Sequence, residues 1–388
     1  MQQSRLFQSA SFRGVTLPNR IVISPMCQYS AIDGMANDWH LVHLGKFAQG
    51  GAGSVMVEAT AVTAEGRITH GDVGLWHDGQ IAPLKRIAAF IRENGSVPAI
   101  QLAHAGRKAS MQRPWFGNAA LDDSDRVRGD LPWRIVAPSA IPMDDGWLMP
   151  HELSIADLKA LLESWRLATL RAVEAEYKFL ELHCAHGYLL HEFLSPLSNR
   201  RTDGYGGDRA ARMRYPLEVL ETVRAAWPTD LPLSVRISSV DGIEGGLDLS
   251  DSVAFAKEAK VRGADIIDCS SGGLMGSATA ARIPRGYSFQ VPFAREIRQK
   301  ADIATMAVGL ILHPQQAEDI LTDGSADLIA VGREALFDPN WPLHAQMALE
   351  SRDVAAFAAW PKQYGWWLER REPGLRKLEG PALPFRKA

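Results

Sequence analysis

Two histidines and a tyrosine lie close together in the segment ELHCAHGYLLHEF, directly after a short apolar run. They are His183, His186 and Tyr188. Imidazole N–H groups can donate hydrogen bonds to a carbonyl or nitro oxygen and polarise a substrate, as an oxyanion hole does. A phenol with a pKa of about 10 suits a general acid rather than a base. These residue types therefore predict a site that binds a substrate oxygen and supplies a proton.

Other interpretations of these side chains stay open. A metal site needs further ligands, and the helical HExxH pattern is absent. The histidines can also be core or loop residues, and Tyr188 a packed loop side chain. Arg236 ends another apolar run, where a cation is costly unless an anion, an electron-rich ring or a structural salt bridge meets it. Cys27 is a possible nucleophile, but no neighbour in the sequence favours its thiolate.

Glycine-bearing turns follow the last two apolar runs of the chain. They are Val308-Gly309 and Gly332-Arg333. Turns of this kind bind phosphate through backbone N–H groups and a helix N-terminus. Neither GxGxxG nor GxxxxGK[ST] occurs, so a Rossmann or Walker nucleotide site is not expected. The turns predict a phosphorylated ligand.

Short apolar runs alternate with helical patterns along the chain, which is typical of parallel βα units. The predicted strands are Ile21–Met26, Ser54–Thr60, Val97–Leu102, Phe179–His183, Leu233–Ile237, Asp265–Ser270, Ile303–Val308 and Leu328–Gly332. The predicted helices include Gly79–Asn94, Ser154–Glu176, Asp208–Trp227, Ser250–Arg262 and Pro314–Asp323. Eight such units predict an α/β fold, a (β/α)8 TIM barrel whose strand ends bring the polar residues together. A doubly wound sheet is the alternative.

The chain is longer than the roughly 250 residues of an ordinary barrel. We expect one domain over residues 1–388, with a barrel core at about 20–340, an extended loop at 108–150 and a C-terminal extension at 341–388. The extension is rich in aromatic residues. Such residues dock on the chain's own surface or against a partner subunit.

Charge and cysteine usage exclude several classes of protein. The 42 basic and 45 acidic side chains give a net charge of −3, so no nucleic-acid partner is expected. Cys27, Cys184 and Cys269 lie far apart and form no CxxC pair, which favours a reducing cytoplasm over a disulfide framework or a zinc–thiolate site. Neither a signal peptide nor an apolar run of membrane-spanning length is evident, so no membrane partner is expected.

Several longer segments follow one another along the chain in a specific order. They are NRI with SPMCQYS, VEATAV with EGRIT, IQLAHAGRK, ELHCAHGYLLHEFLSPLSNRRTDGYGG, DCSSGG, AVGLI and DLIAVGRE. From about Leu6 to Arg370 the chain resembles the old yellow enzyme family of FMN-dependent ene-reductases, in particular its thermophilic-like and xenobiotic-reductase branch. The resemblance implies a (β/α)8 barrel that holds non-covalent FMN at its C-terminal mouth. No metal is expected, because the HExxH pattern is absent and no third ligand is placed beside the two histidines.

The resemblance also implies roles for individual residues. Arg236 faces the flavin N1/O2 edge, where negative charge gathers on reduction. Cys27 tunes the redox potential, and Tyr29 contacts the substrate. The implied FMN-binding residues are Ser24, Pro25, Met26, Cys27, Ala59, Gln101, Arg236, Val308, Gly309, Gly332 and Arg333.

The implied reaction is a ping-pong cycle. NADPH or NADH passes a hydride to the flavin and leaves, and the flavin then passes a hydride to the β-carbon of an activated alkene. His183 and His186 bind the carbonyl or nitro oxygen of that alkene, and Tyr188 protonates the α-carbon. The alternatives are a flavin-free barrel lyase or aldolase acting on a phosphorylated substrate, and a non-catalytic flavin-binding sensor.

The C-terminal extension departs from the family's pattern. Some members place an arginine of the neighbouring subunit over the active site, whereas the match here falls on Trp366 and Trp367, with Arg370 nearby. The resemblance implies that these tryptophans bind substrate and that the protein is a homo-oligomer, a dimer or a tetramer. The 108–150 loop, longer than in compact members, is a candidate lid.

Overall fold

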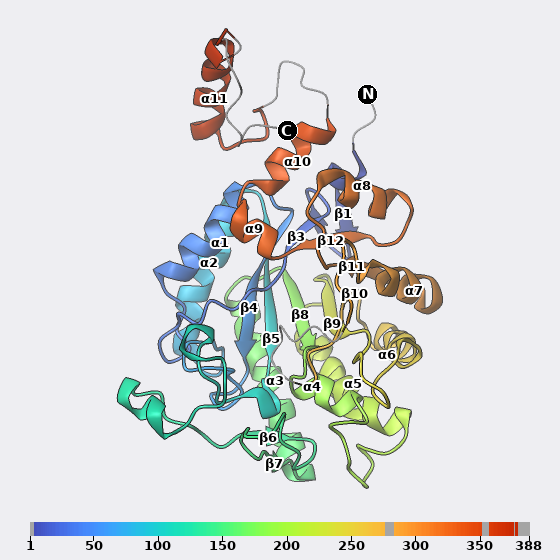
Figure 1. The fold of residues 1–388 in the computed structure, drawn as a ribbon. Coiled ribbons are helices and arrows are strands. Elements are labelled where there is room, and N and C mark those ends of the chain that lie inside the picture. Colours follow the sequence, from blue (N-terminus) through green and yellow to red (C-terminus); the bar gives the residue numbers. More distant parts are fainter. Residues whose placement is uncertain (1–3, 276–282, 351–356, 376, 379–388) are drawn as a thin grey trace.

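A closed barrel of eight parallel strands forms the centre of the protein in this computed structural model (Figure 1). The structure describes residues 4–275, 283–350, 357–375 and 377–378. The order around the barrel is β10-β11-β12-β3-β4-β5-β8-β9, with β12 paired to β3. The strands are β3 (Ile21–Ile23), β4 (Ser54–Ala61), β5 (Val97–Ala103), β8 (Phe179–Cys184), β9 (Leu233–Ser238), β10 (Ile266–Ser270), β11 (Ala304–Ala307) and β12 (Leu328–Val331). The predicted (β/α)8 barrel is confirmed, and the doubly wound sheet is wrong because the sheet closes.

Each predicted apolar run contains one barrel strand. The predicted strand Ile21–Met26 is too long, because β3 already ends at Ile23. Pro25 has no N–H for a strand ladder, and Ser24, Pro25 and Met26 instead line a cavity. The other strand ends differ from the predicted ones by at most one residue.

Helices cover the outside of the barrel (Figure 1). A capping box starts the predicted helix Ser154–Glu176: the Ser154 hydroxyl accepts from the Asp157 N–H, and the Asp157 carboxylate accepts from the Ser154 N–H. The predicted helix Gly79–Asn94 starts later, because Asp78–Gln80 forms a 3-10 turn. The covering helices are α1 (Asp38–Gln49), α2 (Ile81–Glu93), α3 (Ile155–Glu174), α5 (Arg209–Ala226), α6 (Leu249–Val261), α7 (Val291–Ala301) and α8 (Pro314–Thr322).

Short elements close the amino-terminal end of the barrel. The hairpin of β1 (Ala10–Phe12) and β2 (Val15–Leu17) packs Ala10 and Leu17 against the interior side chains nearest the amino-terminal end of the barrel. Helices α10 (Trp341–Leu349) and α11 (Lys362–Leu375) lie at this same end, at the top of Figure 1. The division into core and extension at residue 341 stays a prediction. Among the described residues, no helix is both long and apolar enough to span a membrane.

The long loop after β5 packs over one side of the opposite end, the mouth. It contains β6 (Val136–Ala137), which pairs with β7 (His151–Glu152) directly after the loop. Trp133 donates from Nε1 to the Glu65 carbonyl at 2.9 Å. The Arg67 guanidinium lies 5.2 Å from the Trp133 ring centroid and 5.3 Å from that of Trp76. The loop is thereby fastened to the loop after β4, and its action as a lid stays a prediction.

Candidate active site

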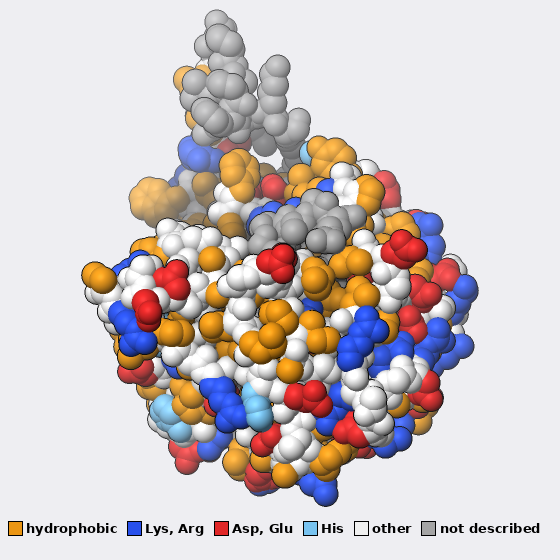
Figure 2. Space-filling model, turned by 60° about the horizontal axis from the view of Figure 1, so that its bottom comes forward, with side chains coloured by type: hydrophobic (Ala, Val, Ile, Leu, Met, Phe, Trp, Pro, Cys, Tyr) orange, Lys and Arg blue, Asp and Glu red, His pale blue; other side chains and the backbone are white. Residues whose placement is uncertain are grey.

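A cavity of about 290 Å³ opens at the carboxyl ends of the barrel strands. Figure 2 views the mouth end and shows hydrophobic side chains across the middle of this face. Nine residues predicted for the site line the cavity: Ser24, Pro25, Met26, His186, Arg236, Val308, Gly309, Gly332 and Arg333. They come from strand ends that are far apart in sequence, so the barrel brings them together as predicted.

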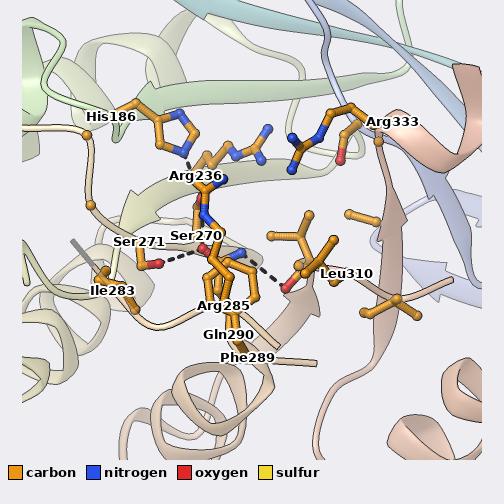
Figure 3. Close-up of a pocket in the computed structure, with 18 of the residues that line it drawn as sticks. His186, Arg236, Ser270, Ser271, Ile283, Arg285, Phe289, Gln290, Leu310 and Arg333 are labelled. Carbon is orange, nitrogen blue, oxygen red and sulfur yellow. Dashed lines mark hydrogen bonds between the residues drawn. The ribbon is translucent and has the colours of Figure 1, made fainter. Parts of the chain in front are cut away.

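Three arginines bring their guanidinium groups to this cavity (Figure 3). They are Arg236, Arg285 and Arg333. The Arg236 Nε lies 3.1 Å from an Asp268 carboxylate oxygen but makes no hydrogen bond, so this buried donor is left unsatisfied. A cluster of cations with an unsatisfied donor favours an anionic or electron-rich ligand.

Glycine is required where β11 ends. Gly309 has a φ of +116°, and a Cβ at this position would lie 2.8 Å from Gln290 Nε2. Gln290 in turn donates to the Val308 carbonyl at 3.2 Å and accepts from Ser271 Oγ at 2.6 Å. At the end of β12, a Cβ on Gly332 would meet only Ser24 Cβ, at 3.8 Å. The chain therefore keeps bare backbone at the cavity wall, as a phosphate cradle needs.

His183, His186 and Tyr188 form one cluster beside the cavity, in which His183 is buried and the other two are half-buried. The ring centroids of His183 and His186 are 5.2 Å apart, and those of His183 and Tyr188 are 4.8 Å apart, with both ring pairs nearly perpendicular. The turn that brings them together runs through His186, with φ +60°, and Gly187, with φ +74°. The three side chains therefore lie within reach of one small molecule.

Both imidazoles are neutral. Burial, followed by the charge of Arg236, holds the pKa of His183 and of His186 well below its ordinary value. His183 Nδ1 accepts from the Ala185 N–H at 3.3 Å, which leaves its proton on Nε2. His186 Nε2 lies 2.7 Å from Ser270 Oγ. Sequence reasoning did not single out Ser270 as a partner of His186, although its place at a strand end was a signal.

Tyr188 and Cys27 keep their protons. Burial, aided by the nearby Cys27 and Asp72, raises the pKa of Tyr188 well above its ordinary value. Burial, aided by the carboxyl groups of Glu58 and Asp72, likewise raises the pKa of Cys27. A thiol without a thiolate is a poor nucleophile, so these surroundings oppose covalent catalysis by Cys27.

Tyr29 belongs to the same region. Its ring meets that of Trp115, from the long loop, edge to face with centroids 6.0 Å apart. Burial raises the pKa of Tyr29, and Cys27 and Tyr188 add to that shift, which places all three groups together. Ala59 and Tyr188 line a separate small hollow. The long loop thus contributes a neighbour to a residue predicted to contact substrate.

Gln101 lies opposite Ala59 on the paired strands β4 and β5. Its side-chain amide donates to Glu181 at 2.9 Å inside the barrel. Glu181 is a further interior residue that sequence reasoning missed, because a carboxylate within an apolar run gives no sign of which side chain it will meet.

Trp366 and Trp367 do not reach the mouth of their own chain. They lie on α11, whose Tyr364 hydroxyl donates to Gln49 Oε1, at the end of α1, at 3.4 Å. This position is at the amino-terminal end of the barrel (Figure 1). Within one chain these residues are separated from the other predicted site residues.

Lys108 is a buried residue that sequence analysis did not assign. Its ammonium donates to the His186 carbonyl at 2.8 Å and also to the Gly273 carbonyl. It therefore ties the turn of the histidine pair to the turn after β10. Burial lowers the pKa of Lys108 to about 7.

Replacing Lys108 by methionine should lower the free energy of unfolding by about 1–3 kcal/mol, because two buried carbonyl oxygens lose their donor. Chemical denaturation of the apoprotein measures this. Lys85→Met is the control, since Lys85 forms only an exposed ion pair with Glu176 and its loss should cost about 1 kcal/mol or less. Equal losses in the two variants would show that Lys108 does not fasten the turns.

No group of three or more His, Cys, Asp or Glu side chains in the described part of the chain is arranged to hold a metal ion.

The fold and the site define a class of protein: a (β/α)8 barrel whose mouth joins a cation-lined cavity to neutral imidazole and phenol groups.

Comparison with known proteins identifies the family. Residues 5–352 match the NADH:flavin oxidoreductase / NADH oxidase family. A protein named NADPH dehydrogenase from Listeria innocua is 44% identical over 363 residues, which cover 93% of this chain and 98% of that protein. One of the same name from Geobacillus is 44% identical over 349 residues, covering 89% and 95%. The chain belongs to this family, that of old yellow enzyme, and is an FMN-dependent oxidoreductase, as the resemblance predicted.

Solved structures show the same fold. The old yellow enzyme homologue from Zymomonas mobilis superimposes with a TM-score of 0.73 at 25% identity, covering 93% of this chain and 98% of that one. Morphinone reductase has a TM-score of 0.74 at 24% identity, covering 92% and 93%.

The residues of the cavity fit FMN. Ser24 Oγ and Arg236 Nε are buried and have no hydrogen-bond partner, so the site leaves polar atoms for a ligand to satisfy. The bare backbone at Gly309 and the guanidinium of Arg333 suit a phosphate group.

Proposed function

We propose that the protein reduces the activated C=C bond of α,β-unsaturated carbonyl or nitro compounds, with NADPH or NADH as hydride donor. The observation that carries this proposal is the cluster of neutral His183, neutral His186 and protonated Tyr188 beside a cation-lined cavity. The relatives named NADPH dehydrogenase support the choice of nicotinamide.

Each residue then has one task. Bound FMN would lie against Ser24, Pro25, Met26, Cys27, Ala59, Gln101, Arg236, Val308, Gly309, Gly332 and Arg333, and it supplies hydride transfer. His183 and His186 donate hydrogen bonds to the substrate oxygen and so draw electrons from its β-carbon. Tyr188 gives its proton to the α-carbon. Tyr29 contacts the substrate, and Cys27 adjusts the cofactor's potential as a thiol.

The neutral imidazoles explain why an acceptor group on the alkene is needed. An alkene without a carbonyl or nitro oxygen offers His183 and His186 no acceptor on the substrate, so it gains no hydrogen bonds that strengthen in the transition state. An isolated alkene is therefore expected to be inert.

The purified holoenzyme tests the proposal directly. It should be yellow, release FMN on denaturation and bleach anaerobically with NADPH. Enones, enals, maleimides and nitroalkenes should then restore the yellow colour, whereas 1-hexene should not. A holoenzyme that bleaches but is reoxidised by none of the activated alkenes would instead be a flavin-binding sensor.

We also propose that two copies of the chain pack through one apolar face. Trp39 and Val42 on α1 and Phe337 on α9 (Arg333–Phe337) are 59%, 68% and 85% exposed. Trp39 and Val42 lie three residues apart and so share a face of α1, and aromatic residues are enriched at interfaces. On α11, Trp366 and Trp367 stack edge to face with ring centroids 4.5 Å apart. In an oligomer these tryptophans would bind substrate at the mouth of a partner subunit.

Changing Phe337 to serine should shift the molecular mass from that of an oligomer towards that of one chain, because it removes a large apolar side chain from the proposed interface. Light scattering after size exclusion measures this. Val261→Ser, at an isolated and 82% exposed position, should leave the mass unchanged. If Phe337→Ser also keeps the oligomer intact, the interface lies elsewhere.

If Trp367 lines a partner's substrate pocket, Trp367→Ala should raise KM for bulky enones, while the reduction of FMN by NADPH keeps its rate.

We propose a cytoplasmic location, which the free thiols of Cys27, Cys184 and Cys269 fit.

A further inference from the structure

A row of polar side chains crosses the barrel interior next to the cavity. Strand register places it: Gln101 on β5 pairs with Glu181 on β8, Glu181 pairs with Ser234 on β9, and Arg236 on β9 pairs with Asp268 on β10. Interior positions of a parallel barrel are ordinarily apolar and branched. A buried acid thus lies between Gln101 and Arg236, the two side chains proposed to contact the flavin ring.

Glu181 has two hydrogen bonds, both from neutral groups. The Gln101 amide donates to one carboxyl oxygen at 2.9 Å, and the Ser234 hydroxyl donates to the other at 2.8 Å. Glu181 is fully buried. Among the described residues, no Lys, Arg or His nitrogen forms an ion pair with it. The Ser234 hydrogen bond favours the carboxylate, but a hydroxyl can also accept, so Ser234 can stay hydrogen-bonded to the protonated acid once its own proton turns away.

The charged groups that act on Glu181 are Asp268 and Arg236. Burial and the negative charge of Asp268 raise the pKa of Glu181 to about 8, against the opposing effects of Arg236, Ser234 and Gln101. Arg236 is itself already paired with Asp268 at 3.1 Å. Its positive charge is therefore only partly available to a further anion.

We propose that Glu181 takes up a proton when the cofactor is reduced. Gln101 and Arg236 would hold the ring of bound FMN, and a hydride, which carries two electrons and one proton, would add one net negative charge there. That charge repels the Glu181 carboxylate in a medium of low dielectric constant. The carboxylate then binds one proton from solvent and becomes the neutral acid, so the net charge of the site is conserved. This inference rests on the placement of FMN given under the proposed function.

The uptake has a defined pH range. Below about pH 8 Glu181 already holds its proton before reduction, so little is taken up. Above that pH it is ionised in the oxidised protein and gains the proton on reduction. Each proton coupled to the reduction changes the equilibrium constant tenfold per pH unit, which is about 30 mV for a two-electron couple. The FMN potential should therefore fall more steeply with pH in this range.

Proton uptake tests the inference on the holoenzyme. One equivalent of NADPH is mixed anaerobically with the protein in weak buffer containing a pH indicator. At about pH 9 the uptake should approach one proton per FMN, and at about pH 7 it should fall towards zero. Wild-type protein that is fully reduced but takes up no proton from about pH 7 to 10 would overturn the inference without any variant.

Two variants assign the proton. Glu181→Gln keeps the shape and should abolish uptake at every pH, together with the extra slope of the potential. Ser234→Ala removes a hydrogen bond that favours the carboxylate, so uptake should persist but begin at higher pH. Uptake that survives Glu181→Gln overturns the assignment.

Failure of the FMN placement is separately recognisable. It would show as unchanged FMN affinity and potential in Arg236→Met, whatever the proton count.

Discussion

Replacing Tyr188 by phenylalanine should slow alkene reduction by about 10²–10⁴-fold, the range that one general acid contributes. Burial keeps the proton on Tyr188, so the side chain enters the reaction as a donor. Phenylalanine keeps the ring that meets His183 edge to face at 4.8 Å, so the packing survives and only the proton is lost. Reduction of FMN by NADPH needs no proton from Tyr188 and should keep its rate.

Anaerobic stopped-flow absorbance separates the two half-reactions, since the flavin bleaches in one and recovers colour in the other. Tyr177→Phe is a matched control. Tyr177 is buried, and its hydroxyl donates to the Leu84 carbonyl at 3.2 Å, away from the site, so loss of this hydroxyl should leave both rates unchanged. Similar losses in both half-reactions of Tyr188→Phe would contradict the role of proton donor.

The barrel itself was predictable because its signal is local. Each strand is a short apolar run bounded by polar or glycine residues, and helices such as α3 carry their own start signal at Ser154. The error at Ile21–Met26 is equally local: an apolar run continues past the point where Pro25 breaks the ladder. Apolar pattern alone does not distinguish a strand from a cavity wall.

The residues at the strand ends were predictable for a different reason. A parallel barrel places all carboxyl ends at one mouth, so His186, Arg236 and Gly309 had to meet there once the fold was assigned. Their partners depend on register and tilt, which the sequence does not specify. The contacts of His186 with Ser270 and of Lys108 with two carbonyl groups depend on register and tilt in this way, so they could not be predicted.

The partner of Arg236 shows the limit most clearly. The sequence left open an anion, an electron-rich ring or a salt bridge, and the structure contains a salt bridge with a donor still unsatisfied. The salt bridge and the unsatisfied donor have the same cause, because Asp268 on the adjacent strand lies close to Arg236 Nε without accepting a hydrogen bond from it. Arg236 is therefore held by the protein and still directed at the cavity.

Replacing Arg236 by methionine should lower the free energy of unfolding of the apoprotein by about 3–5 kcal/mol, because it leaves the carboxylate of Asp268 buried and unpaired. Asp268 is fully buried, so water cannot take the place of the guanidinium. Urea denaturation measures the change. Arg86→Met is the control, since the pair of Arg86 with Asp38 is exposed and should contribute about 1 kcal/mol or less.

The double variant and the pH dependence identify the cause. Arg236→Met with Asp268→Asn leaves no unpaired charge and should recover much of the lost stability, whereas a general packing defect would not be recovered. Burial already raises the pKa of Asp268, and loss of Arg236 raises it further. When the pKa of Asp268 is higher in the folded than in the unfolded protein, its protonated form favours folding. This contribution to the free energy of unfolding is lost as the pH rises through the folded-state pKa. The single variant should therefore lose less stability at about pH 5 than at about pH 8, and an equal loss at both would mean that the charge of Asp268 is not responsible.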